Sequence, residues 1–370
     1  MIIYLPVICF AVLFAQVAKI CEKVTFLHYF FSICSLTLLS VFSGCRDLDV
    51  GFDVMFYEYG IYKSAHYSSS FLDMFHSDVS DIEPFFLFVN YVAVQIVDDI
   101  HFVLGCISFV TLLFAYLACW RCRKYAPFWL LYAVYLLLCY SDSLNIMRQN
   151  MALSIIIYSY AILKVEGLNW KFLFFGMLAV LTHYSAILLL GIFIFYNVMP
   201  KMGKRKYNAF MFSIIALAIL LFPFVDILLI KYSLLTGKDY SFYLDPSLSD
   251  ASWAESVVSG SRIVLVVLFL LLCIYGRKEK MLAELDWREY QCTIIISASC
   301  FIMASMFMGS VLRLFNYFLI LCSFNLCNVA LTLFSSKYGR NKVILALLSL
   351  FIFLAFRFTY VEYSSSILSL

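Results

Sequence analysis

Apolar segments long enough to cross a lipid bilayer recur along the whole sequence, and this feature limits the possible folds more than any other. A helix needs about 20 mostly apolar residues to cross the ~30 Å hydrocarbon core of a membrane. Hydrophobic residues fill 64% of the 370 positions and charged residues only 13%, a composition outside the range of soluble domains. No polar stretch is long enough to form a separate soluble domain. We therefore expect residues 1–370 to form a single all-α integral membrane domain.

The apolar segments predict a polytopic helical bundle of about 10–12 transmembrane segments. The first segment lacks a preceding basic region and an evident cleavage site, so we expect a retained span rather than a signal peptide. Residues 84–97 are few for a crossing, and residues 172–196 are interrupted by Thr182-His183-Tyr184-Ser185, so both stretches are ambiguous. The predicted spans are 2–18, 24–42, 101–119, 126–140, 145–163, 207–230, 262–275, 290–308, 311–334 and 342–360.

Basic residues in the short loops indicate the side of the membrane that each loop occupies, since cytoplasmic loops are enriched in Lys and Arg. Basic clusters begin at Lys19, Arg121, Lys201, Arg277 and Lys337. All of them are cytoplasmic only if residues 84–97 and 172–196 each return to the side from which they start, and we prefer this re-entrant topology. If both stretches cross instead, the Arg121 loop lies outside and Arg148 moves to the cytoplasmic face.

Four arginines lie at the mouths of long apolar segments: Arg46, Arg148, Arg262 and Arg313. A guanidinium at the centre of a bilayer costs ~2.5–3.5 kcal/mol on insertion scales, so it needs a partner or an anionic ligand. If all four face one side, they suit a phosphate-bearing substrate, because each can bind phosphate oxygens through two hydrogen bonds. The alternative for each is an arginine that extends to the lipid head groups while its stem covers apolar surface.

The preferred topology has two sizeable outer loops, residues 43–83 and 231–261. The first is rich in Asp, Ser and Tyr, which suit hydrogen bonds to sugar hydroxyls but also suit a merely solvated loop. The second places aromatic residues beside carboxylates, as a sugar-stacking surface or an interfacial aromatic belt would. His183 lies in the middle of the broken stretch 172–196, where an imidazole needs a hydrogen-bond partner. It either marks a helix break that faces a ligand or bonds a carbonyl of a neighbouring helix.

Four blocks of sequence carry a resemblance to a known family. Met147-Arg148-Gln149-Asn150-Met151-Ala152-Leu153 is followed by Leu178-Ala179-Val180-Leu181-Thr182-His183-Tyr184-Ser185-Ala186. Upstream stand Arg46 through Gly51, Asp53 and Tyr57, and downstream stands Arg313 with Tyr317-Phe318. Together, over about residues 46–318, these blocks resemble the EpsG-type members of the Wzy polysaccharide (O-antigen and exopolysaccharide) polymerase family.

The resemblance implies a GT-C-like membrane glycosyltransferase of the bacterial inner membrane, with its active site on the outer face. Such an enzyme joins oligosaccharide repeat units carried on undecaprenyl pyrophosphate, which serves as donor and acceptor carrier, and the lipid pyrophosphate is the leaving group. The lipid bilayer is its environment, and a chain-length regulator protein is a further partner that the resemblance suggests. It implies no nucleotide sugar and no cofactor.

Roles for individual residues are expected from this resemblance together with the chemistry of such a reaction and the composition of the outer loops. Arg148, His183 and Asp53 are the expected catalytic residues, with Asp53 as the base that removes the acceptor hydroxyl proton. Charge that develops on the departing oxygen is stabilised by fixed cations, so the expected pyrophosphate-binding residues are Arg148, Arg46, Arg313 and Arg262. Asp53 could instead orient Arg46 or Arg148, and Asp47 and Asp49 are rival bases. The expected sugar-binding residues are Tyr57, Gln149 and Trp253.

Other classes of protein fit the sequence less well. We find no Walker loop, no GxGxxG, no HExxH and no metal-ligand cluster, and the single pair Cys119 and Cys122 makes a poor zinc site. The net charge of +3 comes from basic residues scattered at segment ends, so we expect no nucleic acid partner. Two alternatives to a polymerase stay open: a glycan ligase that uses the same lipid carrier, and a flippase or transporter for lipid-linked saccharides.

Overall fold

The computed structural model describes residues 3–51, 53–198 and 362–369, together with positions 203, 206, 209, 213 and 352. Residues 1–197 and 359–370 form one compact unit, and the helices described below belong to it. All regular elements in this described part are helices. The spans expected after residue 198, the outer loop 231–261, Arg262, Arg313 and Trp253 lie outside the described residues.

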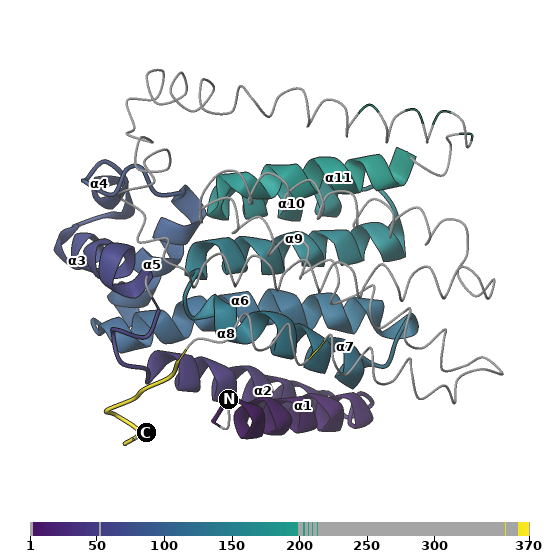
Figure 1. Ribbon diagram of the computed structural model, residues 1–370, viewed down its shortest axis with the longest axis horizontal. Coiled ribbons are helices and arrows are strands. Elements are labelled where there is room, and N and C mark those ends of the chain that lie inside the picture. Colours follow the sequence, from purple (N-terminus) through teal and green to yellow (C-terminus); the bar gives the residue numbers. More distant parts are fainter. Residues whose placement is uncertain are drawn as a thin grey trace, which may run out of the picture. The chain divides into compact units, whose positions relative to one another are not determined.

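Long helices packed side by side form the body of the unit (Figure 1). They are α1 (Tyr4–Ile20), α2 (Thr25–Gly44), α6 (Ile100–Arg121), α9 (Met147–Glu166) and α10 (Trp170–Thr182). Each packs against the next in that order. Among the described helices, the segments Thr25–Gly44 and Ile100–Lys124 are long and apolar enough to cross a bilayer by themselves.

Local sequence fixes where these helices begin and end. The Asp99 side chain accepts a hydrogen bond from the Phe102 amide and so caps α6 (2.9 Å). Asn169 caps α10 in the same way. Gly167 ends α9 at a φ of +79°, a left-handed conformation that favours glycine. The expected span 126–140 forms α7 (Phe128–Tyr135), the π-helix η3 (Leu136–Tyr140) and the short α8 (Ser141–Ser143).

The first outer loop, residues 43–83, is largely helical. It contains the π-helix η1 (Val54–Glu58), α3 (Tyr59–Tyr67) and α4 (Phe71–Phe75), and it leads into α5 (Pro84–Ile96). Pro84 starts α5, as its fixed φ favours, and the 13 residues of α5 make a helix of only ~20 Å. Helices α3, α4 and α5 gather at one end of the bundle (Figure 1).

The interrupted stretch 172–196 consists of α10 and α11 (Ile187–Val198), joined by the 3₁₀ turn η4 (Tyr184–Ala186). A Cβ at Gly176 of α10 would lie 2.5 Å from a methyl carbon of Leu190 in α11, so the two helices run back along each other. The break falls at His183, whose backbone is extended. The re-entrant topology of this hairpin stays a prediction.

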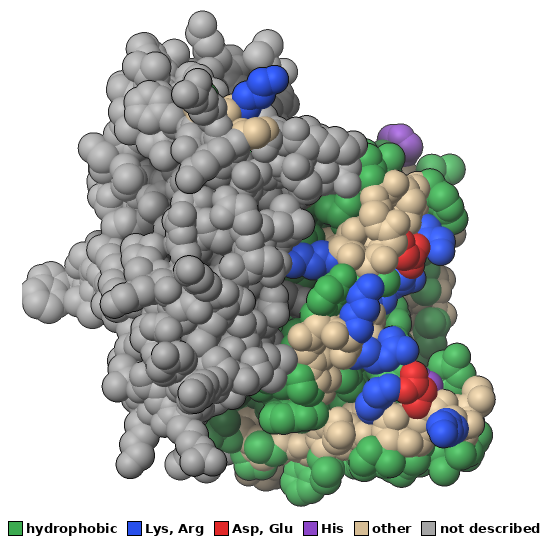
Figure 2. Space-filling view, turned by 90° about the vertical axis from the view of Figure 1, so that its right-hand side faces the viewer, with side chains coloured by type: hydrophobic (Ala, Val, Ile, Leu, Met, Phe, Trp, Pro, Cys, Tyr) green, Lys and Arg blue, Asp and Glu red, His purple; other side chains and the backbone are tan. Residues whose placement is uncertain are grey.

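The two ends of the bundle differ in charge. The loops after α1 and α6 and the end of α9 meet at one end, where Arg123 pairs with Glu22 and Arg121 pairs with Glu166. Figure 2 views this end, where Lys and Arg side chains gather around acidic ones. At the other end, residues 362–369 lie beside the end of α2, where the Tyr363 hydroxyl donates to the Phe42 carbonyl (2.7 Å).

Candidate functional site

Glu83 joins three segments of the chain at the end of the bundle that carries α3, α4 and α5. Its Oε2 accepts a hydrogen bond from Nη1 of Arg148 (3.1 Å), at the start of α9. Its Oε1 lies 2.8 Å from Nδ1 of His183 and 3.3 Å from the amide nitrogen of Tyr184, at the α10–α11 break. The two residues ranked highest from the sequence, Arg148 and His183, are therefore brought together by a third that sequence reasoning missed.

The surroundings of Glu83 keep it ionised. Burial alone would raise the pKa of its carboxyl, but the hydrogen bond with His183 and the electrostatic influence of His183 and Arg148 lower that pKa to about 2. An ionised carboxylate can only accept hydrogen bonds, so Nδ1 of His183 must carry a proton. In a neutral imidazole this leaves Nε2 as the acceptor, the state that a general base requires.

Two neighbouring side chains contact Arg148, and part of its own side chain stays exposed. Glu83 lies on one side, and the Tyr57 ring on another, with its centroid 5.1 Å from Cζ of Arg148. The side chains of Arg148 and His183 keep 19% and 29% of their exposure, whereas Glu83 keeps 5%. A ligand at this end could therefore reach the guanidinium and the imidazole, with Glu83 beneath them.

The start of α9 is positioned by Asn150 and Gly51. The Asn150 amide donates to Oδ2 of Asp142 (2.9 Å) and to the Ile146 carbonyl (3.0 Å), which fixes the turn before the helix. Gly51 has a φ of +91°, and a Cβ there would lie 2.4 Å from the Leu144 carbonyl oxygen. Only glycine permits this approach, which places the segment containing Asp53 against the start of α9.

Arg46 lies deeper than Arg148. It is 1% exposed, and its guanidinium donates to the carbonyl (3.0 Å) and hydroxyl (2.6 Å) of Ser43 and to the Met147 sulfur (3.0 Å). Burial lowers the pKa of Arg46 to about 10, so it stays charged at neutral pH. This environment places Arg46 next to the residue preceding Arg148, but gives it no open surface for direct contact with a substrate.

Glu58 is a second buried carboxyl that sequence reasoning missed. It is 1% exposed, and its Oε1 has no hydrogen-bond partner among the described residues. Burial raises the pKa of Glu58 to about 8, although Arg148 and Arg46 act to lower it. It is therefore mostly protonated at neutral pH, and the positive charge of the two arginines is not cancelled by it.

The other expected site residues lie in several environments. Asp53 and Gln149 are 5% and 3% exposed, so both face the interior. Asp47 accepts hydrogen bonds from the amide (2.8 Å) and hydroxyl (2.7 Å) of Ser366, which ties residues 362–369 to the end of α2. Asp49 is exposed. Within the described residues no group of three or more His, Cys, Asp or Glu side chains could hold a metal ion.

A family match places the chain among known proteins. No curated protein and no solved structure matches the chain. Residues 28–369 match the EpsG family, and this range includes every residue of the cluster around Glu83. Since the match covers most of the sequence, the chain belongs to the EpsG family.

Proposed function

We propose that this protein polymerises oligosaccharide repeat units carried on undecaprenyl pyrophosphate, with the lipid pyrophosphate as leaving group. Membership in the EpsG family supports a membrane polysaccharide polymerase. The observation that carries the finer proposal is the joining of Arg148 and His183 by Glu83. A fixed cation and an oriented imidazole, both partly exposed, are the two groups that such a glycosyl transfer needs.

In the proposed reaction, the hydroxyl oxygen of the acceptor sugar attacks the anomeric carbon of the donor. The bond from that carbon to the diphosphate oxygen breaks, and its electron pair leaves with the diphosphate. The hydroxyl proton passes to Nε2 of His183, while Glu83 holds Nδ1 and stabilises the resulting imidazolium. We assign the base to His183 rather than to the buried Asp53.

Arg148 binds the departing diphosphate in this scheme. In the free protein its partner is Glu83, and a diphosphate would compete for the same N–H donors or use those that remain. Buried Arg46 acts at longer range, because its positive charge raises the electrostatic potential where Arg148 lies. Arg262 and Arg313 stay predictions as further diphosphate ligands, and Tyr57, Gln149 and Trp253 stay predictions as sugar ligands.

An apolar cavity of about 350 Å³ between α5 and α6 supports a lipid-linked substrate. Phe85, Phe88, Val92 and Ile96 line it from α5, the helix that Glu83 precedes. We place part of the polyprenyl tail of the carrier there, because its walls are apolar and it adjoins the helix that starts at the charged cluster.

The site lies on the outer face in this proposal. Cytoplasmic loops are enriched in Lys and Arg, and the basic loops after α1 and α6 lie at the end of the bundle seen in Figure 2. Helix α5, which Glu83 precedes, lies at the other end (Figure 1). The protein would thus work from the bacterial inner membrane on units already moved to the outer leaflet, with a chain-length regulator as a proposed partner.

The test is a gel of lipid-linked glycans from cells that carry wild type, Arg148→Ala or His183→Ala, with Asp78→Asn as an exposed control. We expect single repeat units without a ladder from the first two variants and a normal ladder from the control. Long chains that accumulate on the lipid carrier would indicate a ligase, and single units retained on the inner leaflet would indicate a flippase. A normal ladder from Arg148→Ala would overturn the proposal.

A further inference from the structure

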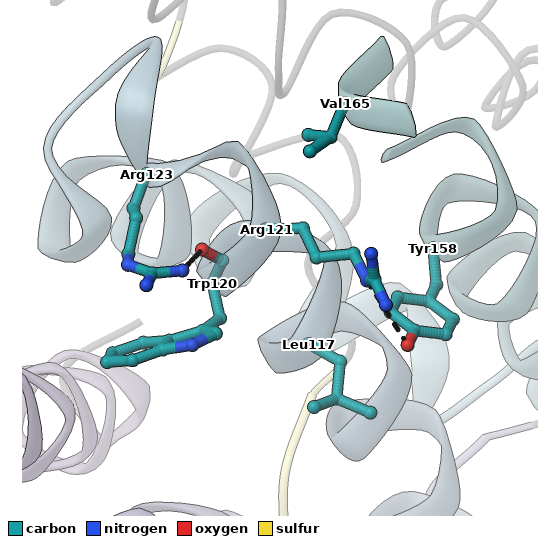
Figure 3. A pocket seen from close by; sticks show the side chains of 6 residues that line it. All are labelled: Leu117, Trp120, Arg121, Arg123, Tyr158 and Val165. Atoms are coloured by element: carbon teal, nitrogen blue, oxygen red, sulfur yellow. Dashed lines mark hydrogen bonds between the residues drawn. The ribbon is translucent and has the colours of Figure 1, made fainter. Parts of the chain in front are cut away.

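A second cavity, which is lined by polar as well as apolar side chains, lies at the basic end of the bundle, away from the candidate site. It has a volume of about 330 Å³ and opens between the end of α6 and the second half of α9. Its walls are shown in Figure 3 and consist of Leu117, Trp120, Arg121, Arg123, Tyr158 and Val165. The cavity thus combines two guanidiniums and a phenol with apolar groups.

Both guanidiniums are fixed by neighbours. Nε of Arg121 donates to the Tyr158 hydroxyl (3.3 Å), and its Nη1 donates to Glu166. Arg123 stacks 4.3 Å from the Trp120 ring centroid, and it donates to the Trp120 carbonyl (2.8 Å) and to Glu22 (3.1 Å). Each guanidinium has five N–H donors, so both keep donors beyond those used in the described part of the chain.

The surrounding charge favours an anion. Within the described residues of this end, basic side chains outnumber Glu22 and Glu166, the acidic ones. The basic set is Lys19, Lys23, Arg121, Arg123, Lys124, Lys164 and Lys171. The glutamates therefore orient the two arginines without neutralising the surface around them.

The apolar surroundings favour a lipid over a soluble anion. Leu117 and Val165 form part of the cavity wall. Large apolar side chains are exposed at the same end of the bundle, with Ile20 at 72%, Phe26 at 75% and Trp170 at 70% exposure. Such residues at helix ends are typical of the boundary between head groups and acyl chains. Basic pockets between helix ends at this level bind the head groups of anionic lipids.

We propose that this cavity binds the phosphate of an anionic phospholipid, such as a phosphatidylglycerol, in the leaflet at the basic end. The two arginines hold the phosphate oxygens, the Tyr158 hydroxyl contributes a further hydrogen bond, and the acyl chains continue along the apolar wall. This proposal is independent of the polymerase activity, because the cavity shares no residue with the cluster around Glu83.

The test is native mass spectrometry of the full-length protein in detergent, titrated with phosphatidylglycerol or, as a neutral reference, phosphatidylcholine. We expect preferential binding of phosphatidylglycerol, and the double variant Arg121→Gln with Arg123→Gln should weaken it by about tenfold or more. Lys63→Gln removes one exposed positive charge on α3 and should leave binding unchanged. Equal binding by the double variant and wild type would overturn the proposal.

Two further measurements test whether a loss of binding is due to misfolding and whether the ligand is a soluble anion. Glu166→Gln removes the negative charge that competes with a phosphate for Arg121, so it should tighten phosphatidylglycerol binding several-fold, a gain that a misfolded protein would not show. Inorganic phosphate at the same concentration should not displace the lipid. Displacement by phosphate alone would assign the cavity to a soluble anion, and no gain from Glu166→Gln would show that Arg121 does not hold the ligand.

Discussion

Oε1 of Glu83 lies 2.8 Å from Nδ1 of His183, although 100 positions separate the two residues in the sequence. The contact joins the start of α5 to the break between α10 and α11, and Arg148 completes it from α9. Because the carboxylate fixes which imidazole nitrogen bears the proton, Glu83 is, in the proposed reaction, a positioning residue that acts through His183.

Glu83→Gln should lower polymer formation by about 10²-fold or more, since an amide cannot accept from both Arg148 and His183 as a carboxylate does. Synthesis from lipid-linked repeat units measures this, and thermal unfolding checks that the variant is folded. Adding His183→Ala to Glu83→Gln should cost little more, because the two residues act as one unit. If the activity losses of the two single variants multiply in the double variant, Glu83 does not act through His183. Near-normal activity of Glu83→Gln would show that Glu83 has no role in the reaction.

Stability should fall as pH rises from about 5 to 8 because of Glu58. Its pKa is raised to about 8 in the folded protein, so the folded state holds a proton that the unfolded chain releases near pH 4.5. The stabilisation is therefore complete below the unfolded pKa and is lost as pH passes through the folded pKa. Unfolding temperatures at pH 5.5 and pH 8.5 measure it, and Glu58→Gln should reduce the difference. If the difference between the two unfolding temperatures is unchanged in Glu58→Gln, a group other than Glu58 causes the pH dependence.

Gly51→Ala should destabilise the protein by about 2 kcal/mol or more, because a side chain there meets the Leu144 carbonyl in a left-handed backbone conformation. Gly60→Ala is the matched control, since a Cβ at Gly60 meets nothing within 4 Å. This control should be neutral or slightly stabilising within its helix. Chemical denaturation in detergent compares the two variants, and equal stability would contradict the role of Gly51.

Val92→Trp should reduce the preference for long carrier lipids by filling the apolar cavity between α5 and α6. Val92 is 38% exposed, so the larger ring can enter the cavity without disturbing the core. With donors on a long and a short polyprenyl chain, kcat/KM should fall for the long chain only. Leu13→Trp, on the exposed face of α1, should change neither. An equal loss of kcat/KM for both donors would show that the polyprenyl tail does not occupy this cavity.

Much of the bundle follows from the sequence. The expected spans 24–42 and 101–119 correspond to α2 (Thr25–Gly44) and α6 (Ile100–Arg121), because their apolar runs are long. Asp99 also marks the start of α6 as its cap. The polar run Thr182-His183-Tyr184-Ser185 indicates an interruption of the apolar stretch 172–196, and α10 does end there. Periodicity and hydropathy are local properties of the sequence, and they are enough to predict where these helices lie.

The arrangement of the site could not be read in the same way. Glu83 stands before a proline at the start of a short helix, as acidic residues often do, and nothing local ties it to Arg148 or His183. The burial of Arg46 and Glu58 was missed because residues 43–83 were expected to be a loop, whereas they fold into helices that cover one end of the bundle. Such contacts depend on tertiary packing, which polar composition alone does not predict.

The hydrogen bonds between Ser366 and Asp47 hold two segments that are distant in the sequence on the same side of the membrane. Residues 362–369 lie beside the end of α2, so they face the same compartment as Arg46. An epitope inserted after Ser369 would thus report, from one antibody measurement on intact cells, which side of the membrane presents the Glu83 cluster.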